Sequence, residues 1–558
     1  MSRKAKTARL PKLCGADIEL GNFVLGVERP EGSGAEASRA LLREIDGVSG
    51  TPASQTTCGC ATCRARLLWS AGEDDAAFDP EAPDPQDWGR KFLASNGGCA
   101  YIDLDHLELC LPEVLSAYDH VACWHAMLRI AQAALAAANA RQAPGRKLQV
   151  LVNNSDGGGN SYGSHLSFLV TRRAFDDIFH RKLHHMAYLA AYQASSIVFT
   201  GQGKVRSENG ALPASYQLSQ RADFFETMTG VQTTFRRPLV NSRDEPLCGS
   251  AGRLGGAADA GKPGAGMARL HVIFFDNTLC PVASLLKVGV TQIVLAMLEA
   301  GRVDPKLTLD DPLAAVARWS HDSHLRARAA LTSGSELTAV ELQLLFCEQA
   351  RSFVDGGGCE GLVPRAPEIL ELWEDTLQKL HARNLEALAP RLDWVLKLTL
   401  LERARNAERR LAWESPEMKH LDHLYSSLDP AEGLYWALAG NGFVESVVGE
   451  AEVARFVREP PEDTRAWGRT ALLRSVGRGA VASVDWDSVR LKTGANGSGV
   501  SYRSVELANP LGSTRRELEP VLRRASTLDD VLNAIEAPPS SRRRAARRRK
   551  RGGVHEIS

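Results

Sequence analysis

The order of the expected secondary structure elements along this 558-residue chain predicts an α+β fold. Apolar segments of strand length come early, and segments with helical periodicity accumulate later. The chain shows no internal repeat, and its length exceeds that of one small domain. One large domain with a smaller one, or two to three domains, is therefore expected.

Five short apolar segments predict strands. The first covers residues 14–25 (CGADIELGNFVL), and the second covers residues 99–105 (CAYIDLD). Residues 147–153 and 165–171 follow, separated by a polar, glycine-rich segment, and residues 270–276 (LHVIFFD) form the last of the five.

Apolar periodicity predicts a long helix over about residues 112–141 and four later helices. The later helices are expected at about residues 283–300, 338–354, 366–383 and 386–412.

Two segments predict solvated, irregular structure. Residues 72–87 contain three prolines and seven acidic residues, which is typical of a loop. The basic tail around residues 541–551 (RRRAARRRKRG) is expected to be disordered. Such a tail could bind nucleic acid or an acidic partner electrostatically, or it could be a solubilising extension.

The composition favours a soluble globular protein, with 44% hydrophobic and 24% charged residues. The formal net charge is zero, so the surface as a whole is not built for nucleic acid. No apolar run was expected to approach the roughly 18–20 residues that span a membrane, and the N-terminus lacks the apolar stretch of a signal peptide. A cytoplasmic location without membrane contact is therefore expected.

The 11 cysteines are odd in number and scattered, which favours reduced thiols over a disulfide framework. Cys58, Cys60 and Cys63 are spaced so that they could bind zinc, with Cys14 or a histidine as the fourth ligand of a structural site. The alternative is a loop with reduced or redox-active thiols.

Asp17 and Glu19 lie two residues apart in the first expected strand, so they share one face of the sheet. Two carboxylates on one face repel each other unless a cation or an arginine lies between them, and magnesium is a good candidate. The alternative is an edge strand with a solvated acidic face.

Tyr101, Asp103 and Asp105 share a face of the second expected strand by the same rule, and His106, Glu108 and Glu113 follow just past its end. A cluster of acids at a strand end could supply metal ligands and a general base. The alternative is an ordinary acidic loop after a strand.

Residues 153–165 (NNSDGGGNSYGSH) contain three consecutive glycines, which allow close approach of the backbone to a ligand. Amides and hydroxyls such as that of Ser161 could cradle phosphate, and His165 could bind metal or nucleotide. The segment is not a Walker loop, and a polar hairpin is the alternative.

Arg221 and Arg243 each lie among polar residues beside an apolar segment. Arginine is the natural bidentate partner of phosphate oxygens, but each could equally form a structural salt bridge with a neighbouring acid.

Nine blocks of sequence, in this order, resemble the motifs of the Pup ligase and Pup deamidase/depupylase family, relatives of glutamine synthetase and other carboxylate–amine ligases. The blocks are residues 15–21 (GADIELG), 101–113 (YIDLDHLELCLPE), 153–165, 217–221 (QLSQR), 241–246 (NSRDEP), 269–273 (RLHVI), 433–435 (GLY), 460–467 (PPEDTRAW) and 484–486 (VDW). The resemblance runs from about residue 13 to residue 536, which is nearly the whole chain.

Some features resemble the depupylase branch more than the ligase branch. His106 follows Asp103 with the depupylase spacing, and the stretch 37–96 looks like the inserted loop of depupylases. Three further segments also resemble the depupylase branch more closely: residues 163–165, 200–203 and 230–234.

The resemblance implies a curved, antiparallel sheet like that of glutamine synthetase, packed with helices, over residues 13–468. The inserted loop 37–96 would lie within this catalytic domain, a small C-terminal domain would cover residues 469–537, and the basic tail would cover residues 538–558.

The resemblance also implies roles for the candidate residues. Asp103 would be the catalytic carboxylate, acting as nucleophile or general base on a Gln carboxamide or a Gln/Glu–Lys isopeptide. Magnesium-site positions are matched by Asp17, Tyr101 and Glu108, with Glu19 and His165 completing the cation or nucleotide surroundings. Arg221 and Arg243 would hold the phosphates of ATP, and Trp486 would contact the nucleotide.

The implied function is an ATP- and Mg²⁺-dependent deamidase or depupylase acting on a Pup-like protein tag and on tagged proteins, in a pathway connected to the proteasome. The alternatives are an ATP-dependent ligase that attaches the tag to lysine and a catalytically impaired homologue that binds tag or nucleotide.

Six positions depart from the family pattern. Asp17 replaces a glutamate, Leu107 a proline, Leu166 an acid and Leu247 a histidine, while Cys99 stands where an ATP-contacting arginine is expected and Leu111 where a threonine or serine is expected. The loss of an arginine at a phosphate would lower affinity by about one to two decades.

Overall fold

The computed structural model describes residues 9–49, 90–245, 266–407, 411–476, 478–496, 499–525 and 527–536. Cys58, Cys60, Cys63, Leu247, the acidic loop at residues 72–87 and the basic tail at residues 538–558 lie outside these ranges.

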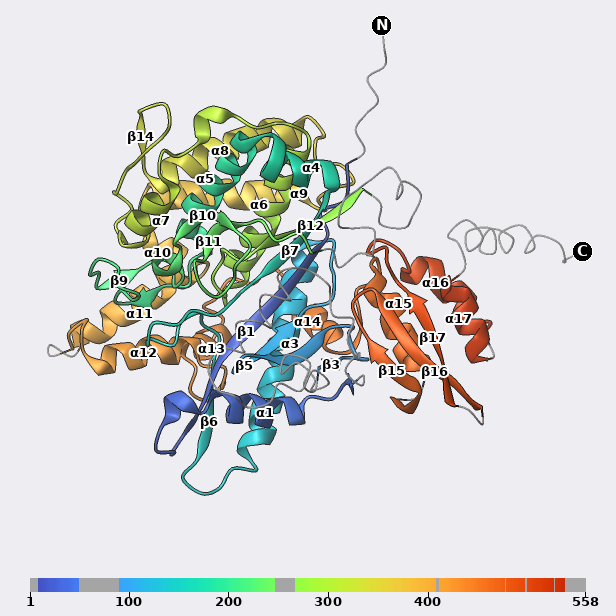
Figure 1. The fold of residues 1–558 in the computed structure, drawn as a ribbon. Helices are drawn as coiled ribbons and strands as arrows, with labels where there is room; N and C mark the ends of the chain where they lie inside the picture. Colours follow the sequence, from blue (N-terminus) through green and yellow to red (C-terminus); the bar gives the residue numbers. More distant parts are fainter. Residues whose placement is uncertain are drawn as a thin grey trace, which may run out of the picture.

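One eight-stranded sheet organises the large part of the molecule (Figure 1). Its strand order is β12-β7-β1-β5-β4-β3-β2, and β6 also pairs with β1. All of its pairings are antiparallel. The strands are β1 (Cys14–Leu25), β2 (Val48–Ser49), β3 (Lys91–Phe92), β4 (Cys99–Asp103), β5 (His106–Cys110), β6 (Lys147–Leu151), β7 (Leu166–Thr171) and β12 (Met267–Val272). The α+β class expected from the sequence is confirmed.

The second expected strand is shorter in the structure than in the sequence prediction. β4 ends at Asp103, and the chain turns through Leu104 so that residues 106–110 return beside it as β5. Leu104 adopts a φ of 50°, a conformation that leucine rarely takes and that carries no turn signature in the sequence. His106 and Glu108 therefore lie in a strand of the sheet, not in a loop past a strand end.

Helices cover the sheet and form a large body next to it (Figure 1). The long helices are α3 (Ala117–Asn139), α5 (Leu183–Thr200), α6 (Pro281–Glu299), α8 (Ala339–Asp355) and α9 (Ala366–His381). The helix expected at residues 386–412 is divided into α10 (Leu385–Leu388) and α11 (Asp393–Ala407), because Pro390 cannot continue a helix. Shorter elements are α4 (Arg172–Asp176), α7 (Pro312–Ser320), α12 (Pro416–Ser426), α13 (Leu434–Gly440), α14 (Glu450–Arg458), β8 (Lys204–Val205), β9 (Tyr216–Gln217), β10 (Thr227–Gly230), β11 (Pro238–Asn241), β13 (Ala329–Ala330) and β14 (Glu336–Leu337).

Helix α1 (Gly34–Glu44) has no counterpart among the helices expected from the sequence. Its buried residues Ala37, Leu41 and Leu42 join the main apolar core. The expected inserted loop 37–96 thus begins within a helix and ends in β3 and the turn after it, and its middle, residues 50–89, lies outside the described residues.

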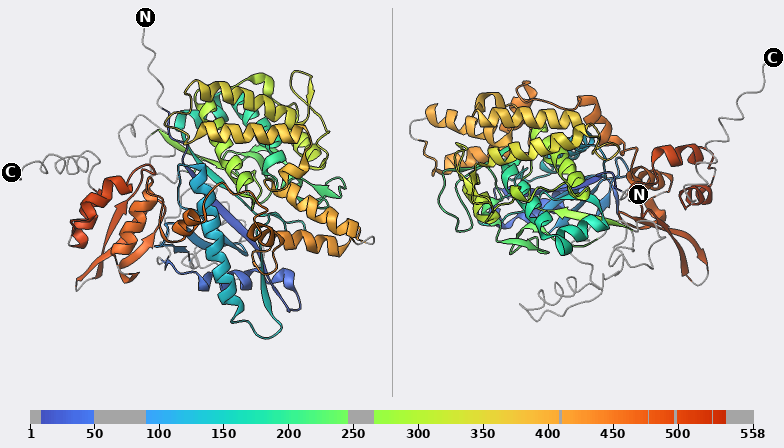
Figure 2. Two further views of the ribbon diagram at one scale, coloured as in Figure 1. Left: turned by 180° about the vertical axis from the view of Figure 1, so that it is seen from behind. Right: turned by 90° about the horizontal axis from the view of Figure 1, so that it is seen from above.

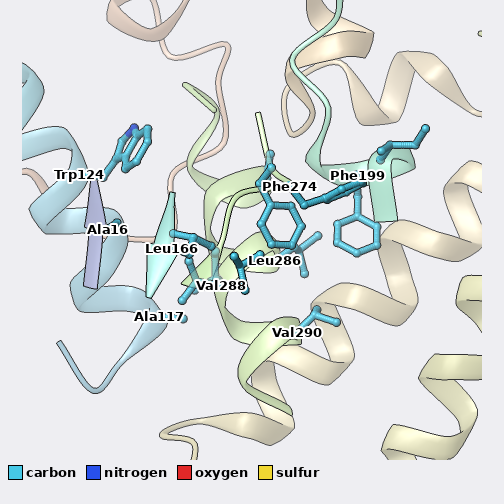
Figure 3. Packing of buried hydrophobic residues seen from close by; sticks show 14 of the residues in the cluster. Ala16, Ala117, Trp124, Leu166, Phe199, Phe274, Leu286, Val288 and Val290 are labelled. Atoms are coloured by element: carbon cyan, nitrogen blue, oxygen red, sulfur yellow. The ribbon is translucent and has the colours of Figure 1, made fainter. Parts of the chain in front are cut away.

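Two helices, α3 and α6, are long and apolar enough to cross a membrane by length and composition, contrary to the expectation that no run reaches this length. Core helices of soluble proteins pass the same test, and the apolar window of α6 is wholly buried inside the protein. Figure 3 shows side chains of β1, β7 and α6, including Ala16, Leu166 and Val288, in one apolar cluster. Their position in the core explains the composition of these segments.

The C-terminal part has an apolar core of its own at one side of the molecule (Figure 2). It consists of α15 (Arg465–Ser475), β15 (Val481–Val484), β16 (Ser488–Asn496), β17 (Gly499–Glu506), α16 (Arg515–Leu522) and α17 (Leu528–Glu536). Its core also includes Val48, Phe92, Cys99 and Cys110 of the main sheet. The two parts therefore pack against each other at the β2–β5 side of the sheet, and the domain boundary expected at residue 468 falls within α15.

Candidate active site

The register of four strands arranges the candidate side chains in rows on one face of the sheet. Directly opposed residues in an antiparallel pair point to the same face. The first row contains Asp17, Cys110, Cys99 and Phe92; the second contains Glu19, Glu108 and Tyr101; the third contains His106 and Asp103.

Four carboxylates from these rows form what we call the acidic centre: Asp17, Glu19, Asp103 and Glu108. One oxygen from each of Glu19, Asp103 and Glu108 lies within 4.8 Å of the others. Burial raises the pKa of Asp17 and of Glu108 well above their ordinary values, and neighbouring carboxylates raise both further. The pKa of Glu19 is raised as well, chiefly by burial.

Neighbouring backbone and side-chain groups hold the acidic centre in place. The His165 amide donates to Asp17 Oδ1 at 2.9 Å, and the Gly163 amide donates to Glu19 Oε2 at 2.6 Å. Tyr101 Oη donates to Glu108 Oε1. A Cβ at Gly163 would lie 2.6 Å from Glu19 Oε1 and 2.4 Å from His165 Nε2, so the close approach of this backbone requires glycine.

The donor set of the acidic centre fits a hard divalent cation. Several buried carboxylates that repel each other, with raised pKa values, are stabilised together by a cation between them. The oxygen ligands are those that magnesium prefers. Glu19 and Glu108, with Asp17 beside them, would hold such a cation next to the Asp103 carboxylate.

The acidic centre lies at a cavity of about 380 Å³, a size typical of small-molecule sites. Asp17, Asp103 and Glu108 line its acidic side. Its other lining residues include the bases Arg90, His165, Arg243, Arg269, His271 and Arg465, together with Asp485 and Trp486. The cavity thus offers acidic ligands for a cation beside cationic ligands for an anion.

The arginines on the β12 side are held only loosely by acids. Arg243 Nη1 lies 3.8 Å from Glu245 Oε2, and Arg269 Nη2 lies 3.4 Å from the same oxygen. Arg269 also donates from Nε to the carbonyl oxygen of Glu245 at 2.8 Å, so the long ion pair of Arg243 is the looser of the two.

Arg221 and Ser161 are placed differently from the other predicted nucleotide ligands. Arg221 is fully buried and donates to the carbonyl oxygen of Tyr162, and burial lowers its pKa. The Ser161 carbonyl accepts from Arg237 Nη2 at 2.8 Å, and its hydroxyl is buried without a partner in the part of the chain that the structure describes. Neither residue lines the cavity. Arg221 instead supports the segment that carries Gly163 and His165.

His165 and His271 form a buried pair with ring centroids 5.1 Å apart. Burial lowers the pKa of each ring well below its ordinary value, and nearby arginines, including Arg269, lower it further. Both rings are therefore neutral at pH 7. His165 Nδ1 lies 3.3 Å from Asp17 Oδ1, so this ring joins the acidic centre to the arginine side of the cavity.

Trp486 and the residues around it form what we call the C-terminal wall: Arg465, Asp485, Trp486 and Pro510. The Trp486 ring packs edge-on against Phe92 at 5.3 Å. Glu113 ties this wall to the sheet, accepting from Arg465 Nε at 2.6 Å and from Arg469 Nη2 at 2.8 Å. Burial alone would raise the pKa of Glu113, but Arg469 and Arg465 outweigh burial and lower it to about 2.

The departures noted in the sequence have different structural settings. Leu107 and Leu166 are fully buried in the main core, and Cys99 is fully buried in the apolar cluster under the C-terminal part. Leu111 is buried but lines the cavity. Sequence reasoning missed Arg90, Arg269, His271 and Arg465 as cavity residues, because their signal is strand register and long-range packing. Arg269 and His271 did lie in a quoted motif block, at alternating positions of a strand.

Comparison with protein families gives one match, to the family described as Pup-ligase protein, over residues 55–490. Among curated proteins, the chain is 35% identical over 462 residues to a depupylase of Acidothermus cellulolyticus, covering 82% of this chain and 86% of that protein. It is 35% identical over 447 residues to the Pup deamidase/depupylase of Mycolicibacterium smegmatis (80% and 82%). It is 33% identical over 443 residues to the Pup–protein ligase of Acidimicrobium ferrooxidans (78% and 90%).

Solved structures resemble the whole fold. The ligase PafA in complex with Pup has a TM-score of 0.70 at 22% identity, with 98% of each chain covered. PafA in complex with ADP has a TM-score of 0.65 at 24% identity, with 81% of this chain and 90% of that chain covered. The chain therefore has the α+β fold of these proteins.

Proposed function

This chain belongs to the Pup ligase and depupylase family, and from this premise we propose that it is an ATP- and magnesium-dependent hydrolase. Its substrate is a Gln carboxamide, or a Gln/Glu–Lys isopeptide, of a Pup-like protein tag. The observation that carries the proposal is the position of Asp103. This carboxylate lies within 4.8 Å of Glu19 and Glu108, at a cavity that also presents arginines.

Asp103 acts on the substrate carbonyl, either directly as nucleophile or as the base that takes a proton from water. Ammonia leaves from a carboxamide, and the lysine amine leaves from an isopeptide. Magnesium, held between the acidic residues and the phosphates of ATP, would supply the positive charge that stabilises the oxyanion. Glu19 and Glu108 hold the cation side, and Tyr101 orients Glu108 through its hydrogen bond. Arg243 and Arg269 bind anionic groups on the opposite side.

Nucleotide binding is part of the proposal. PafA, whose fold this chain shares, was solved with ADP. Trp486, at the C-terminal wall, is proposed as the contact to the nucleotide base.

The hydrolase branch is favoured over the ligase branch by sequence. Two depupylases are 35% identical to this chain, a third depupylase is 33% identical, as the ligase is, and the spacing of Asp103 and His106 resembles that of depupylases. The second candidate is a ligase that joins the C-terminal carboxylate of a tag to lysine, and it is favoured by the likeness to a ligase in complex with Pup. In either case, tagged proteins of a proteasome-linked pathway in the cytoplasm are the proposed partners.

Incubation of the full chain with a Gln-ended Pup, or with a pupylated protein, separates these functions. Release of ammonia or of free tag in the presence of ATP and Mg²⁺ supports the hydrolase. Conjugation coupled to ADP formation contradicts the hydrolase and supports the ligase. Binding of tag or nucleotide without either reaction identifies a catalytically impaired homologue.

A further inference from the structure

An arginine that the sequence motifs do not include, Arg90, lines the cavity. We propose that Arg90 binds a phosphate of the nucleotide, taking over the contact that an arginine at position 99 would make in the family pattern. The inference rests on the proposed function, because it assigns a role in the same nucleotide site.

Strand register brings Arg90 to the face of the acidic centre. Lys91 is paired with Ala100 and Phe92 with Cys99, so Arg90 lies at the level of Tyr101. Its guanidinium carbon is 4.4 Å from the centroid of the Tyr101 ring. Arg90 therefore extends the row of side chains that begins with Glu19 and Glu108.

The neighbours of Arg90 fix the direction of its side chain. Lys91, the next residue, points to the other face, where its Nζ donates to the carbonyl oxygens of Leu42 and Ile45 at 2.6 and 2.7 Å. Phe92 returns to the cavity face and packs against Trp486. Because side chains alternate along a strand, Lys91 and Phe92 hold Arg90 towards the cavity.

Arg90 has the donors that a phosphate needs. Its Nε is buried without a hydrogen-bond partner in the described part of the chain. The guanidinium lies over the ring of Tyr101, whose hydroxyl donates to Glu108, and Asp485 and Trp486 of the C-terminal wall line the same cavity as Arg90. Because the acidic residues, Arg90 and Trp486 line one cavity, a nucleotide that fills it would bring its phosphates near Arg90, and the planar fork of arginine suits phosphate oxygens.

Cys99 lies close to Arg90 in the sheet, and Arg90 takes over the phosphate contact that an arginine at position 99 would make. Cys99 is fully buried in the apolar cluster with Phe92 and Cys110, and it does not line the cavity. Phe92 is its direct partner across the strands, and Arg90 lies two residues before Phe92 on the same face. The guanidinium of Arg90 is therefore on the same face of the sheet as position 99, where it can make the phosphate contact expected of an arginine at that position.

The test is calorimetric binding of ATP, ADP and adenosine to the full chain with Mg²⁺, comparing the wild type with Arg90→Gln and Arg90→Lys. We expect Arg90→Gln to bind ATP and ADP about ten- to a hundredfold more weakly while its affinity for adenosine is unchanged. Arg90→Lys restores part of the loss, since it keeps the charge and lacks the fork. Cys99→Arg in the Arg90→Gln background is expected to regain ATP affinity.

The matched control is Arg490→Gln, because Arg490 stacks on Tyr502 at the same 4.4 Å and does not line the cavity. Its ATP affinity should equal that of the wild type. Thermal melting confirms that each variant is folded. Unchanged ATP affinity in folded Arg90→Gln, or an equal loss for adenosine, overturns the inference. Absence of ATP binding by the wild type instead overturns the proposed function.

Discussion

Two groups of buried carboxylates face the same cavity, and their pKa values shift in opposite directions. In the acidic centre, burial and mutual repulsion raise the pKa values of Asp17 and Glu108. At the C-terminal wall, Arg469 and Arg465 lower the pKa of Glu113 to about 2 despite its burial. The difference separates two uses of a buried acid. Glu113 is neutralised by arginines of the protein, and its ion pairs join two parts of the fold. The carboxylates of the acidic centre lie among like charges, which a bound cation would stabilise.

The largest effect is expected from Asp103→Asn in the acidic centre. The substitution removes the carboxylate that we propose as nucleophile or base, so kcat should fall by about 10²- to 10⁴-fold. Nucleotide affinity should change little, because the C-terminal wall is intact. Steady-state hydrolysis of the tag and ATP calorimetry on one preparation measure both quantities. Full activity in this variant would show that the catalytic assignment is wrong.

The next effect is expected from Glu113→Gln, which leaves Arg465 and Arg469 buried without their carboxylate. The free energy of unfolding should fall by about 3–5 kcal/mol in denaturant titration. Glu462→Gln is the control, since its pair with Arg515 is largely exposed and screened by solvent, so its loss should change stability little. A loss no larger than that of the control would contradict the role of Glu113 as the tie between the two parts.

The ion pairs of Glu113 with Arg465 and Arg469 also predict a loss of stability at low pH. Because the folded pKa is lowered to about 2 and the unfolded pKa is about 4.3, the stabilisation is complete above the unfolded value. It is lost as the pH falls from about 4.3 through about 2. The wild type should therefore lose its stability advantage over Glu113→Gln within this pH window, as measured by denaturant titration at each pH.

The acidic centre predicts the opposite pH dependence in the absence of metal. The pKa values of Asp17 and Glu108 are raised, so the folded protein binds more protons than the unfolded chain, and its stability falls as the pH rises above about 4. Mg²⁺ at about 100 times its Kd should add about 2.7 kcal/mol, and at a fixed Mg²⁺ concentration this increment should grow as the pH rises, because the ligands must be deprotonated to bind.

Glu108→Gln sharpens this comparison. The variant should be more stable than the wild type in EDTA, because one repelling charge is gone, and Mg²⁺ should stabilise it less. Glu36→Gln, which alters an exposed pair with Arg146, should keep the full Mg²⁺ increment. Thermal melting with EDTA and with Mg²⁺ measures both. Equal Mg²⁺ stabilisation of wild type and Glu108→Gln would place the cation elsewhere.

The smallest effect is expected from Cys99→Ala, in the apolar cluster under the C-terminal part. The thiol is fully buried and does not line the cavity, and burial raises its pKa to about 12. ATP affinity should change by less than about twofold, and stability should fall by roughly 1 kcal/mol for the small cavity left behind. A tenfold loss of ATP affinity would make Cys99 a ligand and weaken the case for Arg90.

The sequence was sufficient to predict which side chains share a face of the sheet within one strand, because side chains alternate between the two faces. The bounds of β1 agree with those expected, so Asp17 and Glu19 could be placed on one face. The return strand β5 could not be placed, because Leu104 turns the chain without a glycine or asparagine. The approach of Asp103 to Glu19 depends on that turn, and it follows from no spacing along the chain.

Arg90 and α1 show a second limit. The amphipathic pattern of α1 was present, with Ala37, Leu41 and Leu42 on its buried face, but it lies next to a long polar stretch and was overlooked. Arg90 acquires a role only through the pairing of β3 with β4, which depends on the tertiary register of two residues. Such a contact follows from the folded sheet, not from local propensity.

Strand β1 has a consequence for the synthesis of this protein. It lies near the N-terminus, yet its partners β5, β6 and β7 extend to Thr171. At ribosomal rates of about 5–20 residues per second, β1 waits on the order of ten seconds before all three partners exist. During that interval a twelve-residue strand with Ile18, Leu20 and Val24 has open edges on a nascent chain. The element that carries Asp17 and Glu19 is thus also a segment that chaperones would need to protect during translation.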